Sequence, residues 1–252
     1  MLPCRSRFAP APHLPWLALL ALTMISVPAA AQQTDGGAPA ATNDLDITAA
    51  HVEILHELEL AVFEISVEGR AGHTIPEAAG QLDGAPVLGY VFPTTLKPED
   101  VGFAPGDGIV ALAATSHPDF DDTPLWDEGA NGVYDDDGRI FHSHWVVLVP
   151  DDRVAGGLSV KATQNVESDL PPTAPGMPMY LDSPGFQVVL RDGLLKIIVP
   201  LFRMSNRTDF QFDAVSAYMR VNTSQPDAPM LGVFKVYSVL SSDLSLPYTV
   251  DQ

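Results

Sequence analysis

Short segments of the chain alternate apolar and polar residues, which is the pattern of β-strands rather than of helices. These segments are rich in β-branched and aromatic residues and are bounded by Gly, Pro, Asp and Asn. They cover residues 86–92, 108–116, 139–149, 154–162, 186–190, 194–202, 210–221 and 231–240. Asp192-Gly193 lies between two of them and predicts a tight β-hairpin in which both residues adopt a positive φ.

The segment from Ile47 onward adds a further strand region. Leu58, Leu60 and Val62 alternate in one phase, and residues 63–67 alternate in the other, which predicts a β-bulge near Val62. Residues 48–58 are the best helix candidate, although they could equally extend the first strand. Because strand signals dominate, we expect an all-β fold: an antiparallel β-sandwich or barrel with one long acidic loop, in a single domain over residues 47–252.

The N-terminal segment is typical of a processing signal. Arg5 and Arg7 precede an apolar run over residues 16–27, and small residues at 29–31 form a cleavage site. This predicts a signal peptide over 1–31, followed by a disordered tether over 32–46, and a periplasmic or secreted location. No later run is apolar for long enough to form a membrane-spanning helix, so no membrane span is expected. Cys4 belongs to the signal, which leaves no thiol for disulfides.

The charge of the chain is strongly negative, with 32 acidic against 13 basic residues and a formal net charge of −19. Such a surface repels phosphate backbones and anionic lipids and attracts cations. We therefore expect no nucleic-acid partner, while a small-molecule or carbohydrate ligand stays open. A solvated acidic surface is the alternative explanation of the charge.

Much of this charge lies between His117 and His144, where eight carboxylates accompany three histidines. Two carboxylates about 6 Å apart repel each other by roughly 2 to 3 kcal/mol at an effective dielectric near 20, so a compact loop favours a bound cation. The candidate oxygen ligands are Asp127, Asn131, Asp135 and Asp137. Their spacing does not fit the twelve-residue EF-hand loop, yet the composition favours calcium over zinc, iron or copper. A plain solvated loop and an acidic lid over an active site are the alternatives.

A second kind of metal site is predicted by His142 and His144, which share one face of a strand. His117 and Asp119 form a similar pair after residues 108–116, with Asp121 close behind. If the strands at 108–116 and 139–149 are neighbours, both pairs lie at the same rim of the sheet. Histidines with one carboxylate are ligands of catalytic zinc and non-haem iron. The alternative is that these histidines bond only to ordinary side chains or water.

Three functions are compatible with these patterns. The first is an exported binding or structural module that holds a divalent cation, calcium before the transition metals. The second is a zinc or non-haem iron enzyme that uses the H-x-H site with one open coordination position. The third is an envelope structural protein without a site. No nucleotide-binding, serine-hydrolase or zinc-protease motif is present, so the sequence favours a protein that is not an enzyme.

Overall fold

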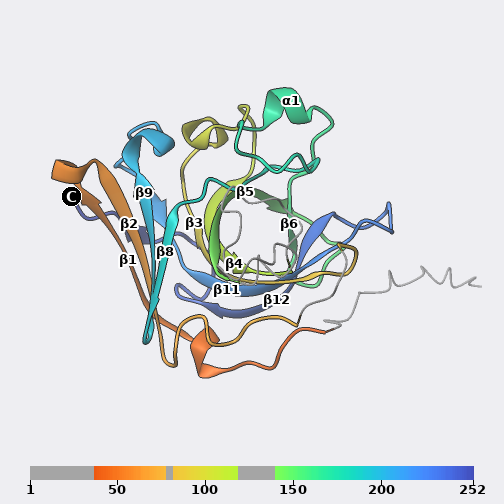
Figure 1. The fold of residues 1–252 in the computed structure, drawn as a ribbon, viewed down its shortest axis with the longest axis horizontal. Coiled ribbons are helices and arrows are strands. Elements are labelled where there is room, and N and C mark those ends of the chain that lie inside the picture. Colours follow the sequence, from red (N-terminus) through yellow and green to blue (C-terminus); the bar gives the residue numbers. More distant parts are fainter. Residues whose placement is uncertain (1–36, 78–81, 119–139) are drawn as a thin grey trace, which may run out of the picture. The chain divides into compact units, whose positions relative to one another are not determined.

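The computed structural model describes residues 37–77, 82–118 and 140–252, which form a body built almost entirely of antiparallel strands (Figure 1). The predicted all-β fold is confirmed. The strands are β1 (Ile47–Leu55), β2 (Leu60–Val67), β3 (Pro86–Pro93), β4 (Ile109–Ser116), β5 (His142–Pro150), β6 (Leu158–Val160), β7 (Leu181–Asp182), β8 (Gln187–Arg191), β9 (Leu194–Pro200), β10 (Gln211–Phe212), β11 (Val215–Val221), β12 (Leu231–Val239) and β13 (Tyr248–Thr249). The helical turns are η1 (Asn43–Leu45), η2 (His56–Leu58), η3 (Pro98–Val101), α1 (Val166–Asp169) and η4 (Leu201–Met204).

Within the described residues, six strands form a closed barrel in the order β4-β3-β11-β12-β6-β5, and β5 pairs again with β4. Closure leaves no free edge except where strands are short. Alternation along each strand sends one set of side chains into the barrel and the other set outward. On β5, Val146 and Leu148 face the interior, whereas Trp145 and Val147 face outward. Both faces of these barrel strands are therefore buried, and their sequences are nearly continuous runs of apolar residues.

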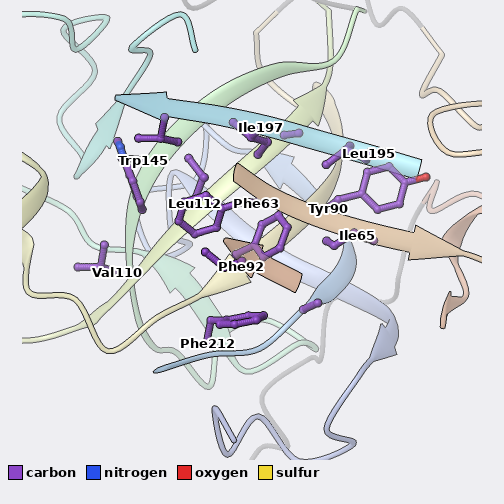
Figure 2. Packing of buried hydrophobic residues seen from close by; sticks show 14 of the residues in the cluster. Phe63, Ile65, Tyr90, Phe92, Val110, Leu112, Trp145, Leu195, Ile197 and Phe212 are labelled. Carbon is purple, nitrogen blue, oxygen red and sulfur yellow. The ribbon is translucent and has the colours of Figure 1, made fainter. Parts of the chain in front are cut away.

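A four-stranded antiparallel sheet, ordered β1-β2-β9-β8, packs against the outer face of the barrel (Figure 1). Phe63 of β2 lies at the centre of the interface, with its ring 5.3 Å from that of Phe92 and 6.4 Å from that of Trp145 (Figure 2). Both ring pairs meet edge to face, an arrangement that aromatic quadrupoles favour. This aromatic core fixes the outward face of β3, β4 and β5, and so fixes which residues of β4 and β5 point inward.

Three local predictions can be compared with the structure. The predicted bulge near Val62 is absent, because β2 pairs with β1 and β9 in continuous register past that residue, and the change of phase only reflects apolar residues on both faces. Residues 48–58, for which a helix and a strand were both open, lie in strand β1 up to Leu55 and in the turn η2 after it. In the predicted tether, residues 32–36 lie outside the described residues, but Leu45 is buried in the core, so the packed body begins before Ile47.

The β8–β9 hairpin is confirmed, with Arg191 paired to Leu194. Its turn differs from the predicted one, since Asp192 has a φ of 53° and Gly193 is not left-handed. Gly193 is required for a different reason: a Cβ there would lie 2.9 Å from the carbonyl oxygen of Val67. Among the described residues, no helix is both long and apolar enough to cross a bilayer.

Candidate metal centre

The candidate site lies where β4 ends and β5 begins. The two strands are antiparallel neighbours, so the condition stated for a shared rim is met, and Thr115 pairs with His142 while Ala113 pairs with His144. This register places both histidines of β5 beside the C-terminal end of β4. His117 follows one residue after the end of β4 and lies on the same side as Thr115. Sequence spacing and strand pairing together thus bring three imidazoles to one end of the barrel.

The three imidazoles form a tight, buried cluster. One ring nitrogen of each of His117, His142 and His144 lies within 4.8 Å of the others. The Nε2 atoms of His117 and His142 are 2.9 Å apart. Ring centroids are separated by 4.6 Å between His117 and His142, by 4.7 Å between His142 and His144, and by 5.7 Å between His117 and His144. All three residues are at most 3% exposed, so bulk water does not surround them.

Backbone carbonyls fix the tautomers of two of these rings. His117 Nδ1 lies 2.8 Å from the carbonyl oxygen of Pro118, and His142 Nδ1 lies 2.7 Å from that of Ile140. A carbonyl oxygen only accepts hydrogen bonds, so each Nδ1 carries the hydrogen and donates it. In the neutral rings the lone pair then belongs to Nε2. Two such lone pairs 2.9 Å apart repel each other unless a proton or a metal cation lies between them.

The third ring is held in a similar way by β7, which pairs with β5. His144 Nδ1 lies 3.3 Å from the carbonyl oxygen of Asp182 and 3.1 Å from the hydroxyl of Ser183. Both oxygens can accept a hydrogen bond from Nδ1, and in that tautomer the lone pair belongs to Nε2. An imidazole that binds a metal through one nitrogen commonly donates its other N–H to a carbonyl or carboxylate, which orients the ring. Each of the three rings has an oxygen beside Nδ1 that can give this support.

Asp182 itself is fully buried beside the cluster, and its side chain faces Arg203, with Arg203 Nη2 3.5 Å from Asp182 Oδ2. Burial raises the pKa of the Asp182 carboxyl, and the positive charge of Arg203 opposes this rise. The guanidinium also lies over the ring of Phe186, 5.4 Å from its centroid. Asp182 and Arg203 therefore hold the β7 segment, and with it the carbonyl that supports His144.

Three imidazole nitrogens in this arrangement suit a first-row transition metal. Zinc–nitrogen bonds of about 2.0 to 2.1 Å in a tetrahedron separate the nitrogens by about 3.3 Å, close to the 2.9 Å between His117 Nε2 and His142 Nε2. Calcium is a hard cation that takes oxygen ligands, so this cluster does not suit it. The predicted oxygen ligands Asp119, Asp121, Asp127, Asn131, Asp135 and Asp137 lie outside the described residues. Calcium binding therefore stays a prediction.

Sequence reasoning did not find the groups that support the rings. Asp182 and Ser183 follow His144 by nearly forty positions and reach it only because β7 pairs with β5. Leu181-Asp182 is too short and too ordinary to be recognised as a strand. The chain matches no protein-family model, no curated protein and no solved structure. The histidine cluster is accordingly the feature of the molecule from which a function can be inferred.

Proposed function

We propose that the protein binds a first-row transition metal, zinc before the others, through His117, His142 and His144. The observation that carries this proposal is the 2.9 Å distance between Nε2 of His117 and Nε2 of His142. In both rings the other nitrogen, Nδ1, faces a backbone carbonyl oxygen. A metal ion between the rings removes the lone-pair repulsion. Three histidines are also a ligand set of catalytic zinc sites, in which the fourth position stays open. The set differs from the two histidines and one carboxylate typical of non-haem iron.

The geometry supports a catalytic centre better than a purely structural one. Structural zinc sites are closed by four protein ligands, whereas the described residues bring three ligands together, the number found in catalytic sites that keep a position for water or substrate. When bound, such a metal lowers the pKa of its water to about 7 and so supplies hydroxide at neutral pH. The residues of this chain would hold the three rings rigidly through the carbonyls of Pro118, Ile140 and Asp182. Fixed ligands favour one coordination geometry over others.

Elemental analysis of the protein purified without chelator tests this proposal. We expect close to one zinc per chain in the wild type, and loss of the metal in His142→Ala and His144→Ala. The matched control is His56→Ala, because His56 is exposed on η2 and away from the cluster, and this variant should keep the metal.

Two other results would change the proposal. Calcium that is bound equally by the wild type and the histidine variants would favour the predicted acidic loop and a binding or structural module. Absence of any metal would leave the alternative in which a shared proton joins His117 and His142, and the three-histidine centre would be rejected. The proposal also includes export to the periplasm or the exterior, which rests on the predicted signal peptide over residues 1–31. N-terminal sequencing of the purified protein tests it, and we expect the mature chain to begin at residue 32.

A further inference from the structure

The interior of the barrel contains a cavity of about 70 Å³. Its walls come from β3, β4, β5, β6, β7, β11 and β12, and most of its lining is aliphatic. Small side chains, Ala113 on β4 and Ala217 on β11, line it among valine, leucine and methionine. No Phe, Tyr or Trp is among the residues that line the cavity in the described part of the chain.

The polar groups in this wall gather at one end. His117, His144 and Thr115 all line the cavity, so the apolar chamber opens directly onto the candidate metal centre. Thr115 is 4% exposed, and its hydroxyl makes no hydrogen bond with the described residues. An unsatisfied buried hydroxyl costs on the order of 1 to 3 kcal/mol, which a bound molecule with one acceptor atom would recover. This hydroxyl is an observation independent of the cavity, and it points to a ligand beside the histidines.

Volume and lining restrict the class of ligand. A water molecule occupies about 30 Å³ in the liquid, and an apolar cavity of about 150 Å³ stays dry and takes up benzene or xenon. A cavity of about 70 Å³ is half that size, so it excludes benzene-sized molecules and accepts molecules of a few heavy atoms. An aliphatic wall offers no compensation for a charge. The ligand that fits is therefore small, uncharged and apolar, with at most one or two weak acceptor atoms.

We infer that the barrel interior is a binding chamber for a small, uncharged, apolar molecule of the size of dioxygen or carbon dioxide, held against the three-histidine centre. The chamber itself does not depend on a metal. The part of the inference that makes the ligand a substrate of the centre rests on the proposed function. The two parts are separated by measuring gas uptake with and without a metal.

Xenon is the probe, and methyl NMR of the full chain under xenon pressure is the measurement. In protein treated with EDTA, we expect xenon to shift the methyl resonances of Ala113, Ala217 and Met219, and to leave those of Ala114 unshifted because Ala114 faces the aromatic core. In protein loaded with cobalt(II), we expect xenon to alter the visible absorption spectrum of the metal. Carbon dioxide and dioxygen would then be tested as competitors of xenon.

Filling the chamber provides the variant test. Ala113→Leu places a larger branched side chain in the cavity and should abolish the xenon shifts while cobalt still binds. Ala217→Leu fills the chamber from β11 and serves as a second variant if the first does not fold. The matched control is Ala114→Val, which alters the adjacent residue on the outward face and should keep the xenon shifts.

The outcomes separate the two proposals. Cobalt binding without xenon shifts overturns the chamber and leaves the metal centre standing. Xenon shifts without cobalt binding overturn the metal centre and support the chamber as a gas-binding cavity. Xenon and cobalt binding with no change of the cobalt spectrum overturn the placement of the ligand against the centre.

Discussion

The two apolar regions of this protein share the same strands but are built from different residues. The outward faces of β3, β4 and β5 contribute Phe92, Leu112 and Trp145 to an aromatic core against the four-stranded sheet (Figure 2). The hydrophobic side chains of the inward faces of these strands, such as Ala113 and Val146, are aliphatic, and the buried polar residues Thr115 and His144 lie beside them. Adjacent positions in the sequence thus belong to two environments.

The difference follows from the geometry of a narrow barrel. A barrel of eight strands is just wide enough for side chains to fill it, so six strands leave less room. Gly89 on β3 shows how little room there is on the inner face, because a Cβ there would lie 3.1 Å from Cγ2 of Thr115, its partner on the neighbouring strand β4. Small residues on the inner wall, such as Ala113 and Ala217, leave part of the interior unfilled. We expect the well-packed aromatic core to supply most of the free energy of folding. The barrel interior can then stay incompletely filled and contain the candidate metal centre and its cavity.

The sharpest test compares two leucines, one from each region. Leu112 is fully buried in the aromatic core, and Leu148 lines the barrel cavity. Leucine-to-alanine changes in protein cores cost about 2 to 5 kcal/mol, and the cost depends on how many contacts are lost. We expect Leu112→Ala to lower the free energy of unfolding by about 4 kcal/mol and Leu148→Ala by about 2 kcal/mol, since Leu148 already borders empty space. Urea unfolding measures both, and equal losses would contradict the comparison.

Metal binding to the three histidines at the end of the barrel should raise the free energy of unfolding of the protein. A ligand that binds only the folded state at a concentration one hundred times its Kd adds about 2.7 kcal/mol to the free energy of unfolding. We expect zinc to raise the unfolding free energy of the wild type by this amount and to leave that of His144→Ala unchanged. Val146→Ala, two residues further along β5, is the control and should keep the effect of zinc. An equal effect of zinc on His144→Ala would show that zinc binds elsewhere.

Most of the strands could be predicted from local patterns, because strand residues are β-branched or aromatic and turns carry Gly, Pro and Asp. The strand predicted over 154–162 shortens to Leu158–Val160, since Gly156 packs against β12 so closely that a Cβ would lie 2.5 Å from Val233 Cγ1. Such long-range contacts leave no local signal. The choice between sandwich and barrel was also open, because it depends on the pairing of β5 with β4 and with β6.

The candidate site was partly visible in the sequence. His142 and His144 form an H-x-H pair on one strand, and His117 was placed beside them on the condition that the two strands are neighbours, which they are. The carbonyls that orient the rings could not be predicted, since any residue supplies a carbonyl. The cavity was equally hidden, because Ala113 and Ala114 look alike in the sequence and differ only in the face they occupy.

This pair of alanines gives the next test. Ala114 is fully buried in the aromatic core, whereas Ala113 borders the cavity. Adding methylene groups to a filled core costs about 1 to 3 kcal/mol. We expect Ala114→Leu to lower the free energy of unfolding by about 2 kcal/mol and Ala113→Leu to change it by less than about 0.5 kcal/mol. Thermal or urea unfolding decides, and a larger loss for Ala113→Leu would mean that the barrel interior has no room.

The smallest expected effect on stability concerns the place where β5 pairs with β6 and closes the barrel. Polar contacts of Asp151 with Arg153 and Ser159 lie there. Asp151 follows β5 and accepts hydrogen bonds from Arg153 Nε at 2.8 Å and from the hydroxyl of Ser159 on β6 at 2.8 Å. The hydrogen bonds from Arg153 are the main cause that lowers the pKa of Asp151 from 3.8 to about 2. The folded state thus favours the ionised carboxylate.

Because the pKa is lower in the folded state than in the unfolded chain, the stabilisation by Asp151 is complete above pH 3.8 and is lost as the pH falls through about 2. Arg153 is half-exposed, so solvent screening reduces the effect to about 1 kcal/mol. We expect Asp151→Asn to be less stable than the wild type by this amount at pH 6, and the difference to vanish near pH 2. Urea unfolding of both proteins at pH 6, 4, 3 and 2 measures it. A difference that stays constant over this range would show that the carboxylate charge does not help to close the barrel.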